Sequence, residues 1–395
     1  MRKIFSVLLL FILFIGSDLL FAEAIVIKKG SRANPTLVLA ASSVDNDLKN
    51  EITRMLRVAN WFDLVSSGAG DFILELGGNS YGLSYRLVSG GAVKASGKVM
   101  GNGDNNRCAK ILVDDILKKV FKVPVLCQSK IVFSVGKTMS NRNIAMSDID
   151  GRNFEQITRF KGLAVEPAFA PNGKSVVYSS YGKNNISILE TVIYPRGSRK
   201  LSSFSGLNTG AAISPDGRYL AMILSKDKQV DLYLRDMTSK RLVRLTGDKA
   251  VESSPCFSPD GKFICFLSDK SGRPKLYMVN VNGSQLKLLP SVGREALTPD
   301  WSQDNKIAYT TRIDSEYRIA ILDITTGRNE LVPNLTGRWE SPSWAPDNRH
   351  LVCSKSDSPM RSSLYIIDSW TGKCRKLFNS QNYFSTPNWS KVAIY

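Results

Sequence analysis

Short apolar segments recur along the last two-thirds of the chain, and polar turns separate them at a nearly constant step. One repeat contains four such segments, at residues 254–257, 263–267, 275–279 and 286–289. A turn of related sequence follows the first segment of each repeat, and its copies are Ala170-Pro171-Asn172-Gly173, Ser214-Pro215-Asp216-Gly217, Ser258-Pro259-Asp260-Gly261, Ser302-Gln303-Asp304-Asn305 and Ala345-Pro346-Asp347-Asn348. Successive copies start 44, 44, 44 and 43 residues apart. Four short strands per repeat at this period predict the blades of a β-propeller.

The two ends of the repeat region are incomplete in complementary ways. Residues 130–158 carry three strand signals without the first strand and its turn, whereas residues 385–390 have the pattern of a first strand alone. A blade assembled from both ends would let the C-terminal strand pair near Ile131 and close the ring. We therefore predict an all-β six-bladed β-propeller over residues 128–395, closed by its C-terminal strand. The alternative is an open β-solenoid or two sandwiches, neither of which requires complementary ends.

The region before the propeller has the pattern of a small α/β domain, which we assign to residues 25–127. Strand patterns lie at 36–40, 72–76, 81–87 and 92–100. A first helix is predicted after Asp45, which is placed as its N-cap, because Leu48, Ile52, Met55 and Leu56 share one helical face. A second helix is predicted over residues 106–121.

The N-terminus has the pattern of a secretory signal peptide over residues 1–24. Arg2 and Lys3 precede an apolar stretch at 4–15, and small residues follow at cleavage spacing. An uncleaved membrane anchor is the alternative. We therefore expect an exported protein of the periplasm that is at most peripheral to a membrane.

Charge and cysteines narrow the expected chemistry only slightly. The net charge of +18 favours anionic partners or serves solubility, but the basic residues form no dense run, so nucleic acid is not expected. Among the six cysteines, Cys108 and Cys127 are the best candidates for a disulfide, with buried free thiols as the alternative. Cys256 and Cys265 flank one turn and are expected to face different neighbours.

Catalytic motifs are missing from the sequence. The single histidine, His350, is expected to be an exposed turn residue, and no Gly-x-Ser-x-Gly elbow provides a nucleophile for it. No phosphate-binding glycine loop and no zinc-ligand spacing occur. We therefore expect no enzymatic activity, no cofactor and no metal.

Polar residues just before each first strand form the candidate binding site. In a propeller these positions ring one mouth of the central channel, where loops on a rigid scaffold carry binding. The candidate rim residues are Glu166, Asn208, Thr209, Glu252, Ser253, Ser254, Glu295, Thr298, Glu340, Ser341, Ser385 and Thr386. The alternative is that they only cap the strands and bind channel water.

Several stretches resemble the TolB family of the Tol-Pal system of Gram-negative envelopes. The most specific stretch is residues 266–283, and residues 85–88 and 131–133 also resemble their counterparts in the family. The resemblance implies a non-catalytic periplasmic scaffold, monomeric, that supports outer-membrane integrity and constriction during cell division. It also implies that the peptidoglycan-associated lipoprotein Pal binds the rim, most directly at residues 253–255 and 340–342.

The resemblance also assigns a second partner segment just after the cleavage site. A TolA-like inner-membrane protein would contact Glu23, Ala24, Ile25, Val26, Ile27, Lys28 and Lys29, and other outer-membrane proteins are further candidate partners. The sequence departs from the family in its shorter N-terminal domain, in Lys110 where a histidine is frequent, and in the lost turn glycines at Asn305 and Asn348. The alternative function is an exported carbohydrate-binding or glycan-active propeller that uses carboxylates among Glu252, Glu295 and Glu340.

Overall fold

The computed structural model describes residues 33–394 apart from residues 41–42, 67–69, 184 and 359. Residues 34–395 form one compact unit by their contacts. The predicted signal peptide and the predicted partner segment Glu23–Lys29 lie outside the described residues. Within the described part of the chain, no helix is long and apolar enough to cross a bilayer.

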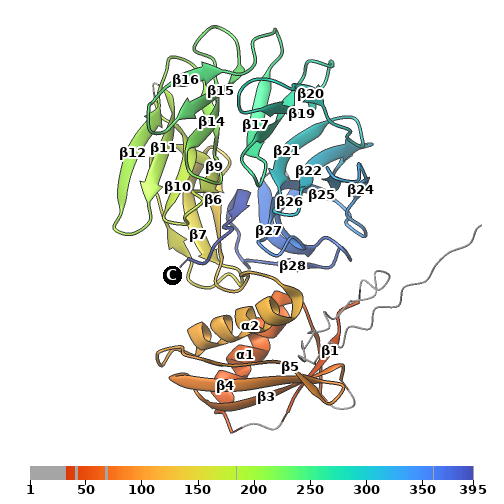
Figure 1. The fold of residues 1–395 in the computed structure, drawn as a ribbon. Coiled ribbons are helices and arrows are strands. Elements are labelled where there is room, and N and C mark those ends of the chain that lie inside the picture. Colours follow the sequence, from red (N-terminus) through yellow and green to blue (C-terminus); the bar gives the residue numbers. More distant parts are fainter. Residues whose placement is uncertain (1–32, 41–42, 67–69, 184, 359, 395) are drawn as a thin grey trace, which may run out of the picture. The chain divides into compact units, whose positions relative to one another are not determined.

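The predicted N-terminal α/β region is confirmed as two helices on one face of a five-stranded sheet (Figure 1). The sheet order is β2-β1-β3-β4-β5; β1 pairs in parallel with β2 and β3, and the other pairs are antiparallel. The strands are β1 (Thr36–Leu39), β2 (Asp63–Val65), β3 (Phe72–Asn79), β4 (Gly82–Ser89) and β5 (Ala92–Val99).

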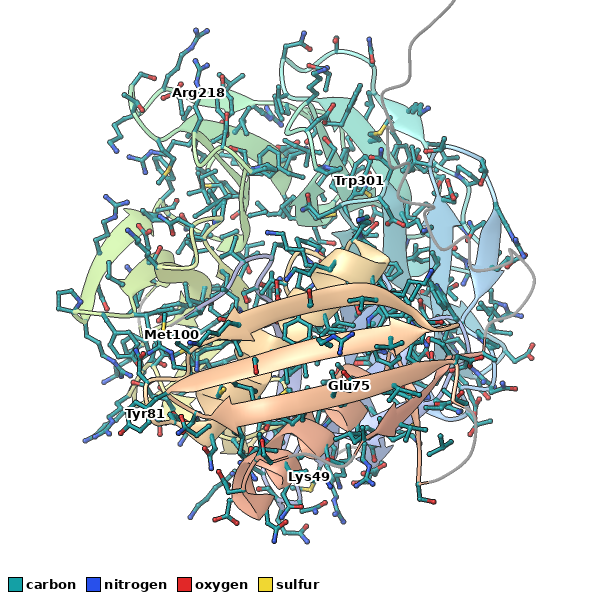
Figure 2. All side chains as sticks on the ribbon, turned by 60° about the horizontal axis from the view of Figure 1, so that its bottom comes forward. Lys49, Glu75, Tyr81, Met100, Arg218 and Trp301 are labelled. Carbon is teal, nitrogen blue, oxygen red and sulfur yellow. The ribbon has the colours of Figure 1, made fainter. Side chains whose placement is uncertain are left out.

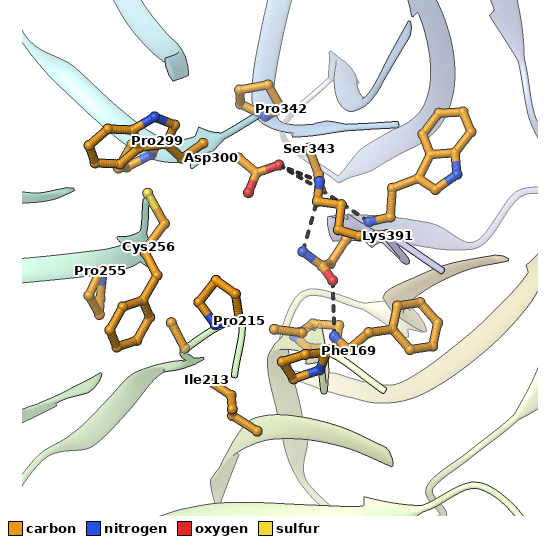
Figure 3. A pocket seen from close by; sticks show the side chains of 18 of the residues that line it. Phe169, Ile213, Pro215, Pro255, Cys256, Pro299, Asp300, Pro342, Ser343 and Lys391 are labelled. Atoms are coloured by element: carbon orange, nitrogen blue, oxygen red, sulfur yellow. Dashed lines mark hydrogen bonds and ion pairs between the residues drawn. The ribbon is translucent and has the colours of Figure 1, made fainter. Parts of the chain in front are cut away.

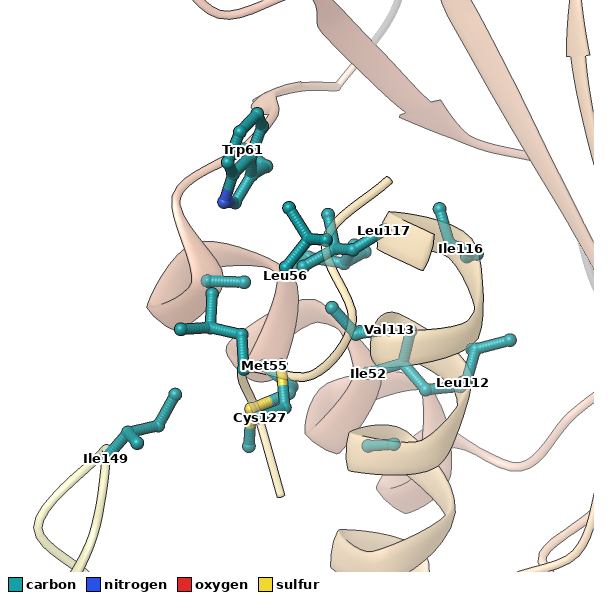
Figure 4. Packing of buried hydrophobic residues seen from close by; sticks show 14 of the residues in the cluster. Ile52, Met55, Leu56, Trp61, Leu112, Val113, Ile116, Leu117, Cys127 and Ile149 are labelled. Carbon is teal, nitrogen blue, oxygen red and sulfur yellow. The ribbon is translucent and has the colours of Figure 1, made fainter. Parts of the chain in front are cut away.

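Both helices begin at an aspartate N-cap, and Asp45 is the cap that the sequence predicts. In α1 (Asn46–Ala59), the Asp45 carboxylate accepts a hydrogen bond of 2.8 Å from the Leu48 amide, and in α2 (Asn105–Phe121), Asp104 accepts one of 3.1 Å from Arg107. The predicted stripe of Leu48, Ile52, Met55 and Leu56 is buried, facing α2 (Figure 4).

The other face of this sheet is open to solvent and is held by weak surface contacts. Arg86 donates to Glu75 at 3.1 Å across β3 and β4, and both side chains are about half exposed. Tyr81, between β3 and β4, and Met100, after β5, are also exposed (Figure 2). This face contributes little to the core, which lies on the helical side.

The rest of the chain forms repeated antiparallel sheets of the propeller type. Four of these sheets have four strands each, in simple order. Their strands are β13 (Asn208–Ile213), β14 (Tyr219–Leu224), β15 (Asp231–Asp236), β16 (Leu242–Arg244), β17 (Glu252–Phe257), β18 (Phe263–Ser268), β19 (Lys275–Asn280), β20 (Lys287–Leu288), β21 (Ala296–Trp301), β22 (Lys306–Ile313), β23 (Glu316–Asp323), β24 (Asn329–Leu331), β25 (Arg338–Trp344), β26 (His350–Ser358), β27 (Arg361–Asp368) and β28 (Cys374–Lys376).

The remaining sheet has eight strands and contains both ends of the repeat region. Its path is β12-β11-β10-β9-β7-β6-β29, with β8 paired to β7. Its strands are β6 (Lys130–Thr138), β7 (Asn141–Asp148), β8 (Glu155–Gln156), β9 (Leu163–Phe169), β10 (Ser175–Tyr181), β11 (Ile186–Val192), β12 (Gly197–Ser202) and β29 (Tyr383–Trp389). The C-terminal β29 pairs antiparallel with β6, and Trp389 lies opposite Ile131, which is the contact that the sequence predicts.

A shared core joins the α/β region to the propeller strands. Buried residues of α1 and α2 belong to the same cluster as Ile131, Ile149 and Trp389. At its edge, Lys110 of α2 reaches Asp148 of β7 at 2.5 Å, and Lys130 donates to the same carboxylate at 2.8 Å. Lys110 is a position at which this sequence departs from the family that it resembles. Its ion pair with Asp148 links the α/β region to the propeller strands.

The expectation for His350 is wrong, because its side chain is only 3% exposed. Its Nδ1 lies 2.6 Å from Asp347, and the same carboxylate accepts a 3.0 Å hydrogen bond from the Trp61 indole. The neighbouring Arg349 guanidinium packs against the rings of both Trp61 and Trp370, which also contact each other. A turn pattern within one repeat cannot reveal that another region packs over it.

The proposed disulfide between Cys108 and Cys127 is also absent, and both are buried free thiols. The Asp114 carboxylate accepts a 2.7 Å hydrogen bond from the Cys127 amide, which fixes Cys127 beside position 114 of α2. Cys108 lies six residues earlier on the same helix, roughly 9 Å along its axis. The structure thus holds the Cys127 backbone at Asp114, and no bond joins the two sulfurs.

Candidate functional site

The innermost strand of each repeat carries the same backbone irregularity. Each pairing shifts register where one residue adopts a positive φ. These residues are Glu166 (55°), Gly210 (61°), Ser254 (50°), Thr298 (44°), Ser341 (54°) and Thr386 (46°). We call them the bulge ring. Only one is glycine, so the other five carry backbone strain of the kind that is concentrated at functional sites.

All six residues of the bulge ring line one cavity of about 600 Å³. Figure 3 shows other residues of its lining, among them Pro215, Cys256 and Lys391. Its wall continues along the innermost strands to the prolines of the turns, such as Pro171, Pro215 and Pro259. A cavity of this size and mixed lining is typical of a binding site on a rigid scaffold.

The cavity contains one ion pair in an otherwise mainly apolar wall. Lys391 Nζ lies 3.3 Å from Asp300 Oδ2, and the same oxygen accepts hydrogen bonds from Ser343 Oγ at 3.1 Å and the Trp344 amide at 2.7 Å. These partners fix the Asp300 carboxylate, so the cavity presents a positioned negative group beside a cation.

The structure separates the predicted rim residues into two groups. Those that line the cavity are Glu166, Ser254, Thr298, Ser341 and Thr386. Those that do not are Asn208, Thr209, Glu252, Ser253, Glu295, Glu340 and Ser385. The division follows the bulge, because the residue directly at the positive φ turns toward the cavity.

Two residues of the second group are structural. The Asn208 side chain is fully buried and makes four hydrogen bonds, to Ser202, Phe204 and Gly206. The Glu252 carboxyl is 2% exposed and accepts from Ser268 at 2.9 Å and from Thr246 at 3.2 Å. Burial raises the pKa of Glu252 to about 7 despite these hydroxyl donors.

Glu340 differs from Glu252 because its carboxylate has no hydrogen bond or ion pair with any residue that the structure describes. Burial raises its pKa, against the charge of Arg338, which lowers it. Glu295 lies 4.0 Å from Arg312 in a partly exposed ion pair. Since none of the three glutamates lines the cavity, they do not form a pair of facing catalytic carboxylates there.

A cluster of side chains that the sequence does not reveal lies beside the bulge ring. Arg142 stacks on the Tyr383 ring with its guanidinium carbon 5.4 Å from the centroid, and it also donates to Ser385. Glu166 accepts hydrogen bonds from Thr209 at 2.6 Å and Ser179 at 2.9 Å. Arg142 and Tyr383 belong to β7 and β29, whose proximity depends on long-range pairing that no local pattern shows.

Within the described residues, no group of three or more His, Cys, Asp or Glu side chains is arranged to hold a metal ion.

The comparisons with known proteins point to one family. Residues 118–393 match the family model described as TolB beta propeller domain. The crystal structure of TolB from Acinetobacter baumannii superposes with a TM-score of 0.80 at 20% identity, covering 91% of this chain and 97% of that one. The structure of putative TolB from Agrobacterium tumefaciens gives 0.52 at 16% identity, with coverage of 67% and 98%.

The propeller fold is also shared with an enzyme. Hydrazine synthase from Kuenenia stuttgartiensis gives a TM-score of 0.55 at 14% identity, covering 67% of this chain and 47% of that one. Likeness at such identities shows the fold alone, so it assigns no activity. The family model, in contrast, matches well over half of the sequence, and the chain belongs to the TolB β-propeller family.

Proposed function

We propose that this protein is a non-catalytic binding scaffold of a Tol-Pal envelope system, located in the periplasm. In this proposal a Pal-like lipoprotein binds at the cavity mouth formed by the bulge ring. The observation that carries the proposal is the bulge ring itself, five of whose residues keep a positive φ without being glycine. Such strain persists only where the surrounding structure imposes it, and its recurrence at the same place in six innermost strands supports a binding role.

A closed six-bladed ring is part of this proposal. The β29–β6 pairing and the recurrence of the bulge in six innermost strands support it. A closed ring would hold the six bulges at fixed separations, which lowers the entropy cost of ordering a partner. The segment Glu23–Lys29 and a TolA-like partner remain proposals from family membership. The same holds for the proposed roles in outer-membrane integrity and constriction at cell division.

The proposal is tested by measuring the affinity of the full mature protein for the soluble domain of a Pal-like lipoprotein by calorimetry. Ser341→Arg places a long cationic side chain at the cavity mouth, at a position whose native residue already has a positive φ. We expect it to weaken binding at least tenfold, because it fills the surface that the partner must contact.

The matched control is Ser239→Arg, at an exposed turn between β15 and β16. It adds the same charge away from the cavity and should leave the affinity unchanged. Equal affinities for both variants and the unmodified protein would reject the cavity mouth as the binding site. Binding of a glycan array without lipoprotein binding would favour the carbohydrate alternative.

A further inference from the structure

Two cysteines face each other in the wall of the cavity. Cys256 of β17 lies directly opposite Cys265 of β18 in the antiparallel register, which corrects the expectation that they face different neighbours. The Ser258 amide donates a 2.9 Å hydrogen bond to the Phe263 carbonyl and closes the turn between them. Cys256 lies two residues before Ser258 and Cys265 lies two residues after Phe263, so the register places the two cysteines opposite each other.

Their geometry is compatible with a disulfide. Directly opposed residues of antiparallel strands have Cα atoms about 4.5–5.5 Å apart, within the range that disulfides span. The bulge at Ser254 lies two residues before Cys256 and adds local twist, which gives the strand freedom to adjust. Both sulfurs are free thiols in the structure.

The two thiols differ in access. Cys256 is partly exposed and lines the cavity (Figure 3), whereas Cys265 is fully buried in the cluster that contains Trp301. A small reagent in the cavity therefore meets Cys256 first. Cys265 is placed behind it as the second thiol.

We propose that Cys256 and Cys265 form a reversible disulfide in the cavity wall by exchange with low-molecular-weight disulfides. The Cys256 thiolate attacks one sulfur of the small disulfide and releases one thiolate, leaving a mixed disulfide on Cys256. The Cys265 thiolate then attacks the Cys256 sulfur and releases the second thiolate. The protein loses two protons and two electrons, and the small disulfide is reduced to two thiols.

The surroundings of the pair set how fast this exchange runs. The opposed Cys265 thiol, together with burial, raises the pKa of Cys256 well above its ordinary value. The thiolate fraction at neutral pH is therefore small, and exchange should accelerate about tenfold per pH unit in the alkaline direction. Because exchange is slow, the pair should stay reduced during a brief exposure to small disulfides and become oxidised under sustained oxidising conditions. Such conditions are those of the periplasm in the proposed function.

The test incubates the folded full mature protein with mixtures of reduced and oxidised glutathione and maps the cysteines by mass spectrometry. We expect a Cys256–Cys265 linked peptide that disappears with excess reduced glutathione. Cys265→Ser should accumulate glutathione on Cys256, because the second thiol is missing. Cys256→Ser should show neither a disulfide nor a glutathione adduct at Cys265, since the Cys265 thiol is shielded from the reagent.

Cys353→Ser is the matched control, because it removes another buried thiol far along the chain, and it should form the same linkage as the unmodified protein. The proposal is overturned if the folded protein forms no such linkage at the most oxidising ratio, or if the linkage appears only after denaturant is added. Glutathione that stays on Cys256 of the unmodified protein would also overturn it, since Cys265 would then fail to act. Circular dichroism on each variant establishes that the reagents meet folded protein.

Discussion

The N-terminal part of β25 and the turn that follows β25 present opposite chemistry. At its C-terminal turn, Asp347 and His350 are buried and paired, and the Trp61 indole covers them. At its N-terminal end, Ser341 lines the cavity and the Glu340 carboxylate lacks a hydrogen-bond partner among the described residues. One end therefore holds the molecule together, and the other keeps polar groups available for a partner.

The largest effect should come from breaking the paired end. Asp347→Ala leaves His350 and the Trp61 indole without their acceptor in a buried site, so we expect a loss of about 3–5 kcal/mol in the free energy of unfolding. Asp260→Ala, at the equivalent but exposed turn of β17–β18, is the matched control and should cost under about 1 kcal/mol. Urea unfolding measures both, and equal losses would refute the difference between the turns.

The lowered pKa of Asp347 also predicts that the folding stability depends on pH in the acid range. Burial acts to raise its pKa, but His350 and the backbone amides of the turn lower it to about 2. Because the folded pKa lies below the ordinary value, its stabilisation is present above about pH 4 and is lost as the pH falls toward 2. In Asp347→Asn the part of the stability loss between about pH 4 and pH 2 that comes from this carboxyl should be absent. A stability–pH curve unchanged from that of the unmodified protein would contradict the role of Asp347.

A second, opposite pH effect should come from Glu252. Its folded pKa is raised to about 7, so its contribution falls as the pH rises from about 4.5 through 7. Glu252→Gln stays neutral, and we expect it to avoid a loss of roughly 3 kcal/mol between pH 4.5 and 8. Thermal unfolding of both proteins across this pH range measures the difference in stability. Curves that run parallel with pH for the two proteins would contradict the prediction.

The smallest effect should come from the available end. Glu340→Gln removes a carboxylate that has no hydrogen-bonded partner within the described residues and whose pKa burial raises, so folding stability at neutral pH should not fall and should rise slightly. Affinity for the Pal-like partner should fall about tenfold if the partner donates to this carboxylate. A large loss of stability would show that Glu340 belongs to the structural group with Glu252.

Much of the fold could be predicted because the repeat is local. The turn phrase, the apolar runs and the N-cap at Asp45 each depend on neighbouring residues. His350, Arg142 and the cysteine pair could not be assigned, because each depends on contacts between distant segments or on register. For Cys256 and Cys265 the signal was present, since the turn that begins at Ser258 fixes the register if its closing hydrogen bond is assumed.

The sequence indicates a set of polar rim residues but not which of them line the cavity. The sequence places polar residues before each innermost strand, yet only those at the bulge turn toward the cavity. A positive φ at Thr298 or Thr386 runs against the preference of a β-branched residue. No sequence rule favours it, so the distinction between lining and structural positions required the structure.

The central claim is that a partner binds at the bulge ring, and photocrosslinking in the cell tests it most directly. A photoreactive residue at Ser254 should crosslink to a Pal-like lipoprotein, while the same residue at Ser239 should not. Crosslinking from Ser239 alone, or no lipoprotein adduct from Ser254 in folded protein, would contradict the account.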